Sequence, residues 1–246
     1  WSVYPNPFVD DITFIFGGDL EGEAELIFYN MAGKKIVMSG MRATGSHAVT
    51  LDAVFVPAAD TVVSTELYMA DGARAWDGDG MGTIPMIAAL ALAASAPAVG
   101  AAEAALDLSR ERLASRVLAY TLGDKAAEHP AAQVRLAAST AEVDALRGAW
   151  DSAVSRTAGY RTTEATPDDR VRTRLAAADA VRRARHIIGT IGEGAGASVY
   201  RSSHPLQRLQ RDVETLKGHV VFDWDRSTEL AGRVLLGMPL RPTDMV

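Results

Sequence analysis

The sequence of 246 residues contains no cysteine. This absence excludes disulfide bonds and metal sites built from thiolates. The sequence also lacks an excess of basic residues, because 25 Lys and Arg stand against 31 Asp and Glu, which gives a net charge of −6. A protein that binds nucleic acid needs a basic face. The composition therefore argues against a nucleic-acid partner.

Two sequence signals are also missing. No G-x-G-x-x-G loop follows a predicted strand, since the Gly-rich run GEGAGA at 192–197 comes after a predicted helix. No nicotinamide-binding motif is therefore predicted. No long apolar run begins with a basic, signal-like region, and the apolar stretch 84–102 is rich in alanine and holds two prolines. We read this stretch as a buried helix and expect a cytoplasmic protein without a membrane segment.

The composition changes near residue 80. Before it, short apolar and β-branched runs alternate with Gly-containing turns, which predicts a small β-barrel or sandwich. Residues 71–82 are rich in Gly and Asp and are predicted to be a linker. After them, alanine and arginine dominate and the apolar period becomes helical. The sequence thus predicts an α+β fold with a β-domain at 1–78 and an up-down helical bundle at 79–246.

Several long helices are predicted in the second half. The first spans about 84–122 and is expected to break at Pro97, with Leu113 and Val117 on its apolar face. The second starts near His129. A third starts after Thr166 as cap, with Pro and two Asp in its first turn, and is expected to stop at the glycines at 189, 192, 194 and 196.

The stretch 198–225 carries the main candidate for catalysis. Pro205 opens a predicted helix, and its apolar stripe comprises Leu206, Leu209, Val213, Leu216 and Val220. His219 lies outside the stripe at the expected helix end. A helix-end histidine is ordinarily stabilised by the helix dipole, but one that titrates near neutral pH also suits proton transfer.

A second motif lies in the predicted β-domain, where SGMRATGSH occupies 39–47. It is a polar turn between strands whose small side chains and free backbone N–H groups permit close approach of a planar or anionic ligand.

Together these motifs resemble the acyl-CoA dehydrogenase superfamily. The runs SGMRATGSHAVTLDAVFVP and GEGAGASVY…HPLQRLQRD occur in the family's order, about 150 residues apart. The family's YEGTxEI-like segment is absent, and TLKGHVVFD stands in its place. That departure is similar to the branch of two-component flavin-dependent monooxygenases, which includes phenol hydroxylases and amino-sugar nitrososynthases of secondary metabolism.

The resemblance implies a site and its cofactors. It implies reduced FAD or FMN delivered by a separate flavin reductase, O₂ as co-substrate and a homotetramer. It implies that His219 is catalytic and that the flavin is bound by Arg42, Thr44, Gly45, Ser46, Arg116, Ser198 and Arg208. The chain begins at Trp1, and the resemblance implies a helical domain before it.

The resemblance leaves the substrate open between the amine nitrogen of an amino sugar and an aromatic or polyketide carbon. Two other functions stay open. An acyl-CoA dehydrogenase-like desaturase would need a carboxylate base beside the flavin, and the sequence offers no convincing one. A scaffold that kept the fold and lost the flavin would bind no reduced cofactor.

Overall fold

The computed structural model describes residues 41, 84–118, 121–241, 244 and 246. The predicted β-domain at 1–78, apart from Met41, lies outside these residues, and so do the predicted flavin contacts Arg42, Thr44, Gly45 and Ser46. The chain divides into two units after Val63, and all described helices belong to the second unit. The helical half of the fold prediction is therefore the half that the structure describes.

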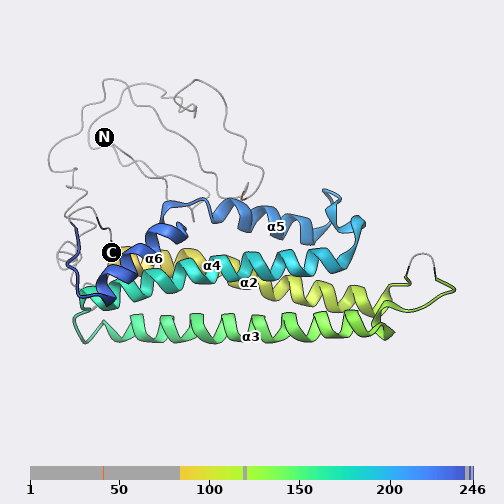
Figure 1. The fold of residues 1–246 in the computed structure, drawn as a ribbon, viewed down its shortest axis with the longest axis horizontal. Helices are drawn as coiled ribbons and strands as arrows, with labels where there is room; N and C mark the ends of the chain where they lie inside the picture. The colour runs from red at the N-terminus through yellow and green to blue at the C-terminus, as the bar shows by residue number, and fades with distance from the viewer. Residues whose placement is uncertain (1–40, 42–83, 119–120, 242–243, 245) are drawn as a thin grey trace, which may run out of the picture. The chain divides into compact units, whose positions relative to one another are not determined.

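The described part is a helical bundle. Its long helices are α2 (Met86–Ser115), α3 (Pro130–Gly159) and α4 (Pro167–Ala195), and its shorter ones are α5 (Pro205–Leu216) and α6 (Trp224–Leu235). Single 3₁₀ turns connect them: η4 (Ala126–Glu128), η5 (Ala197–Tyr200) and η6 (Val220–Phe222). Helix α4 contacts all four other helices, with α2 and α3 along one side and α5 and α6 along another (Figure 1).

Helix α4 begins where the sequence predicted. Thr166 accepts a hydrogen bond from the backbone N–H of Asp169, and the Asp169 carboxylate accepts one from the N–H of Thr166, which completes a capping box. The helix continues past the glycines at 189, 192 and 194 to Ala195 and ends before Gly196, the last of the glycines at which a stop was predicted. Ile187, Ile188 and Ile191 are buried around these glycines, and burial of these side chains outweighs the low helix propensity of glycine.

The predicted break at Pro97 is wrong, since α2 runs through it. Pro97 and Ala93, one turn earlier, are both exposed, so the Ala93 carbonyl that loses its N–H partner faces solvent. The helix ends at Ser115, and Val117, predicted on its apolar face, is 57% exposed beyond it. Helix α2 is long and apolar enough to cross a membrane, but 56% of its most apolar window is buried in the bundle, as in a core helix.

The end of α5 differs from the prediction as well. The helix stops at Leu216, so His219 is the N-cap of the separate turn η6. Val220, predicted on the apolar stripe, is half exposed, whereas Leu206, Val213 and Leu216 are buried as expected. Asp223 then caps α6 by accepting a hydrogen bond from the N–H of Arg226. Two caps within five residues turn the chain sharply and present His219 at the surface of the bundle.

Candidate functional site

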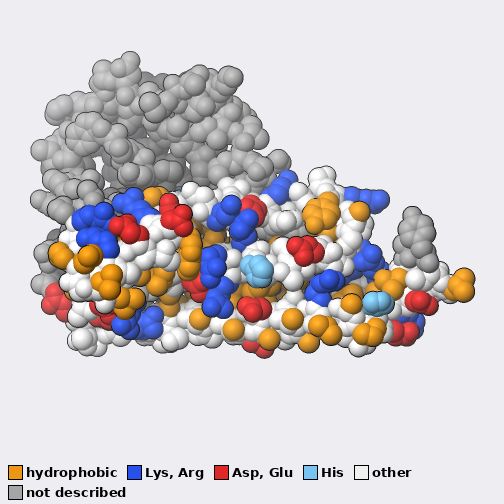
Figure 2. Space-filling view, in the orientation of Figure 1, with side chains coloured by type: hydrophobic (Ala, Val, Ile, Leu, Met, Phe, Trp, Pro, Cys, Tyr) orange, Lys and Arg blue, Asp and Glu red, His pale blue; other side chains and the backbone are white. Residues whose placement is uncertain are grey.

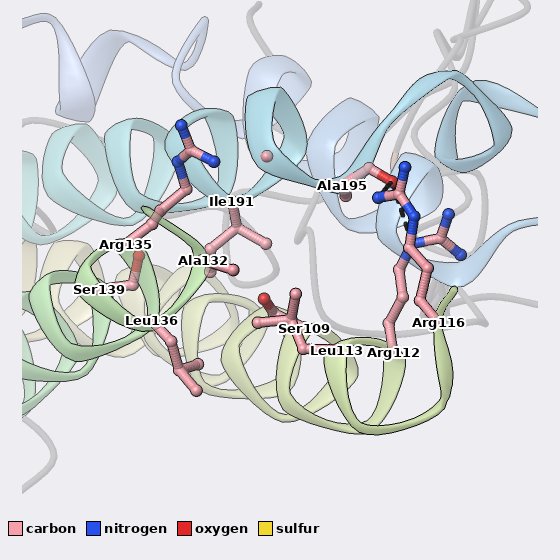
Figure 3. Close-up of a pocket in the computed structure, with 11 residues that line it drawn as sticks. Ser109, Arg112, Leu113, Arg116, Ala132, Arg135, Leu136, Ser139, Ile191 and Ala195 are labelled. Carbon is pink, nitrogen blue, oxygen red and sulfur yellow. Dashed lines mark hydrogen bonds between the residues drawn. The ribbon is translucent and has the colours of Figure 1, made fainter. Parts of the chain in front are cut away.

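Two pockets in the described bundle contain residues that the sequence singled out. The first lies where the end of α2, the start of α3 and the end of α4 meet, and we call it the arginine pocket. It is lined by Ser109, Arg112, Leu113, Arg116, Ala132, Arg135, Leu136, Ser139, Ile191, Gly194 and Ala195 (Figure 3).

Two arginines of this pocket donate hydrogen bonds to the last carbonyl of α4. Arg112 donates from Nε to the Ala195 carbonyl oxygen at 3.0 Å and from Nη2 to Ser198 Oγ at 2.7 Å. Arg116 donates from Nη1 to the same carbonyl at 2.8 Å. The last carbonyls of a helix lack intrahelical partners and carry the negative end of its dipole. The pair of arginines satisfies both needs, and Figure 3 shows both guanidinium groups beside the Ala195 carbonyl.

Glycines allow the guanidinium groups to come this close. Gly196 has a φ of +79°, and a Cβ there would lie 2.8 Å from Arg116 Nη2. A Cβ on Gly194 would lie 2.7 Å from Arg135 Nη1. Gly194 and Gly196, two of the glycines that were expected to stop the helix, therefore leave room for the side chains of Arg135 and Arg116.

The charge of the arginine pocket is uncompensated among the described residues. No described carboxylate lies within ion-pair distance of Arg112, Arg116 or Arg135. Burial, and then the like charge of Arg116, lower the pKa of Arg112. The cavity of about 30 Å³ holds only one or two water-sized groups. The arrangement suits a small anionic group at its mouth and excludes an aromatic ring system from its interior.

The second pocket contains His219, and we call it the histidine pocket. Its volume is about 610 Å³, within the range of small-molecule sites. Helix α4 contributes one wall, and the segment from the end of α5 to the start of α6 contributes the other. The lining residues are Val181, Arg182, Arg185, Lys217, Gly218, His219, Val220, Phe222, Asp223, Trp224 and Asp225.

The hydrogen bonding of His219 sets its chemistry. Its Nδ1 accepts a hydrogen bond from the backbone N–H of Val221 at 3.3 Å. An accepting Nδ1 carries no proton, so the neutral ring carries its proton on Nε2. Partial burial lowers the pKa of His219 from its ordinary value of 6.5. The imidazole is therefore a neutral hydrogen-bond donor through Nε2 at neutral pH.

Charges and aromatic rings surround the histidine. The Arg182 guanidinium lies 4.2 Å from the centroid of the Trp224 ring, and the Phe222 ring centroid lies 6.0 Å from that of His219. Arg185 pairs with Glu214, which also pairs with Lys217 at 3.1 Å. The pocket thus combines aromatic walls with a rim of partly neutralised charge.

The predicted site residues divide between these places. Arg116 lines the arginine pocket, Ser198 accepts a hydrogen bond from Arg112 of that pocket, and His219 lines the histidine pocket. Arg208 is exposed on α5 and lines neither pocket. Sequence reasoning missed Arg112 and Arg135. Arg112 was recognisable as the residue one helical turn before Arg116, whereas the approach of Arg135 to Gly194 is a tertiary contact without a local signal.

Comparison with known proteins shows which proteins this chain is similar to. A flavin-dependent monooxygenase oxygenase subunit, HsaA, from Rhodococcus jostii is 31% identical over 83% of this chain and 54% of its own length. An FADH(2)-dependent resorcinol hydroxylase, oxygenase component, from Rhizobium sp. is 26% identical over 81% of this chain and 51% of its own. The chain spans about half the length of the curated relatives it matches.

The solved structure of XiaF from Streptomyces sp. in complex with FADH2 and glycerol shares the fold. It superposes with a TM-score of 0.79 at 24% identity, covering 89% of this chain and 54% of its own. The family model for the acyl-CoA dehydrogenase C-terminal domain matches residues 92–224. The chain therefore belongs to the acyl-CoA dehydrogenase C-terminal domain family, and its homologues are oxygenase subunits of two-component flavin-dependent monooxygenases.

Proposed function

We propose that the chain belongs to the oxygenase component of a two-component flavin-dependent monooxygenase that hydroxylates a small aromatic substrate. The proposal rests mainly on one observation: His219, whose Nδ1 accepts a hydrogen bond from the Val221 N–H, lines a pocket of about 610 Å³. The names of the relatives, which include an oxygenase subunit and a resorcinol hydroxylase, support the same reaction class.

His219 acts on the proton in this proposal. Reduced flavin, when bound, supplies the electrons that activate O₂. Nε2–H of His219 donates a hydrogen bond to the reacting oxygen, or returns a proton to it, because the neutral ring has a single N–H free of the backbone. Phe222, Trp224 and Val181 line the same pocket and supply its apolar surface.

We assign the phosphate of the flavin to the mouth of the arginine pocket, because the interior of about 30 Å³ is too small to enclose it. Arg112, Arg116 and Arg135 present donors and net positive charge, which is the chemistry that binds phosphate. Ser198 and Arg116 are the predicted cofactor contacts there. Arg208 remains a predicted contact, and Arg42, Thr44, Gly45 and Ser46 remain predicted contacts from a β-domain at 1–78. FAD and FMN both carry the phosphate that this pocket would take.

The walls of the histidine pocket favour an aromatic carbon over an amino-sugar nitrogen as the acceptor of oxygen. Aromatic rings pack well against aromatic side chains such as Phe222 and Trp224. The carboxylate of Asp223 already caps α6 and is thereby less suited to serve as the base of a dehydrogenase. We further propose a cytoplasmic homotetramer that works with a separate flavin reductase.

The test is a product assay. The protein is supplied with O₂, a flavin reductase, NADH and FAD or FMN, and is offered phenols, amino sugars and acyl-CoA thioesters in parallel. We expect a hydroxylated phenol with oxidation of the flavin and little hydrogen peroxide. Desaturation of a thioester, or peroxide alone with every substrate, would contradict the proposal.

A further inference from the structure

A buried arginine in the middle of α4 has no role in the site described above. The Arg174 side chain lies at 3% exposure, although arginine is almost never fully buried unless it is paired. Its Nη2 lies 3.4 Å from the carbonyl oxygen of Val220, which is long for a hydrogen bond. The contact nevertheless brings the positive charge of the guanidinium close to that oxygen. The contact joins α4 to the turn that starts at His219.

The carbonyl that Arg174 contacts belongs to the peptide that holds the histidine. The Val220 carbonyl and the Val221 N–H are the two ends of one peptide group, and the Val221 N–H donates to His219 Nδ1 at 3.3 Å. A cation at the carbonyl end polarises the amide and strengthens its N–H as a donor. The Arg174 guanidinium and the His219 imidazole therefore contact opposite ends of one planar peptide group.

Other charges face this turn. Asp223 and Asp244 attract the Arg174 guanidinium, and Arg226 repels it. Around the imidazole, the pocket is lined by Arg182 and Arg185 from α4, Lys217 after α5, and Asp223 and Asp225 at the start of α6. Several of these charges are already engaged: Arg185 and Lys217 pair with Glu214, and Asp223 caps α6. Arg174 is the one among them that contacts the 220–221 peptide.

We propose that Arg174 is a positioning residue that, through the 220–221 peptide, holds His219 neutral with its proton on Nε2. The inference rests on the proposed role of His219. An imidazolium would place an Nδ1–H against the Val221 N–H, so the peptide must turn or shift before Nδ1 can take a proton. Arg174 resists that movement because the rotated carbonyl would leave a buried cation facing an N–H group.

The experiment titrates His219 by NMR of ¹⁵N-histidine-labelled protein without flavin or substrate, with the resonance assigned by His219→Gln. In Arg174→Met we expect the pKa of His219 to rise by roughly half a unit to one unit. Release of the 220–221 peptide acts in that direction, because Nδ1 is then free to take a proton. Arg174→Lys should keep the pKa near the parent value. The matched control is Arg172→Met, because Arg172 lies on the same helix, pairs with the exposed Asp168 and does not line the histidine pocket.

The outcomes distinguish a purely structural role of Arg174 from a role in positioning His219. A merely structural Arg174 would lower the melting temperature of Arg174→Met and leave the pKa of His219 unchanged in the folded protein, which would overturn the inference. Arg174→Gln, which keeps amide donors without the charge, gives the same comparison should the methionine variant not fold. A raised pKa in a protein that makes no hydroxylated product would support the inference and reject the proposed function. In an active enzyme, the acid limb of product formation should move up with that pKa.

Discussion

The two nitrogens of the His219 ring have separate tasks. Nδ1 is occupied by the Val221 N–H, which leaves Nε2–H for the reaction. In His219→Ala we expect product per oxidised flavin to fall by roughly 10²-fold, the usual contribution of a positioned acid or base. Hydrogen peroxide should replace the missing product. Stability should fall by no more than about 1 kcal/mol, since the side chain caps a single 3₁₀ turn.

The control for this variant is His186→Ala. His186 is exposed on α4 and does not line the histidine pocket. Its removal should leave both coupling and stability near the parent values. Full coupling in His219→Ala, measured as product against peroxide, would contradict the role given to the imidazole.

Acid sensitivity follows from the lowered pKa of His219. As pH falls below about 6.5, the unfolded chain binds a proton at this position before the folded protein does. The folded state thus loses stability as pH falls from about 6.5 through the lower folded-state pKa of His219. We expect the parent to lose more stability than His219→Ala between pH 7.5 and 5.5 in denaturant titrations. Equal losses would show that the folded-state pKa is not depressed.

The arginine pocket makes a prediction about affinity. Arg116→Gln removes a charge that no described carboxylate neutralises, so reduced flavin should bind roughly tenfold more weakly, the worth of one charge-assisted hydrogen bond to phosphate. Arg110→Gln, on the same helix but paired with Asp107 at 3.3 Å, is the matched control. Fluorescence or anaerobic titration would measure both affinities. Equal affinity in the two variants would place the flavin phosphate elsewhere.

At the scale of elements, the end of α4 links fold and site. Gly196→Ala places a side chain at a φ of +79° and 2.8 Å from Arg116 Nη2. We expect a loss of about 1 to 2 kcal/mol of stability and weaker flavin binding through displacement of Arg116. Gly189→Ala is the control, because a Cβ there meets nothing within 4 Å inside a helix. It should stabilise the protein by about 0.5 to 1 kcal/mol. A stable Gly196→Ala variant with normal flavin affinity would remove this link.

Local sequence predicted some helix ends well and others poorly. The start of α4 was predictable because its capping box is made by residues three apart. The continuation of α2 through Pro97 and of α4 through Gly189 was not, because burial against other helices outweighs local propensity there. The end of α5 was placed too late, since Val220 continues the apolar period although it leaves the helix.

At the scale of the molecule, the sequence located the candidate residues but not their grouping. His219, Arg116 and Ser198 were proposed from motifs, and the structure places His219 in one pocket and Arg116 in another, with Ser198 bonded to Arg112. Arg135 and Arg174 carried no signal, because each acts through a contact with a residue distant in the sequence. A helical period gives the buried face of an element, but not which neighbour lies across it.

One face of helix α3 packs in the bundle, and the opposite face is exposed. Its buried positions, which include Val143, Leu146 and Ala153, face α2 and α4. On the opposite face, exposed small residues recur at alternating spacings of four and three: Val134, Ala138, Ala141, Ala145, Gly148, Ser152 and Ser155. Apolar side chains recur along this edge in Figure 2. Such heptad spacing of small side chains allows a helix of a second copy to approach closely.

We therefore expect the proposed tetramer to depend on α3. Ala145→Lys should lower the mass measured by light scattering at micromolar concentration, because a tight helix contact would bury an unpaired charge. Ala158→Lys is the control, since Ala158 is exposed on the same helix but lies off the stripe. A monomeric parent would contradict the assembly, and equal dissociation of the two variants would contradict the role of the stripe. If Ala145→Lys has a lower mass than Ala158→Lys, α3 contacts α2 and α4 with one face and another subunit with the opposite face.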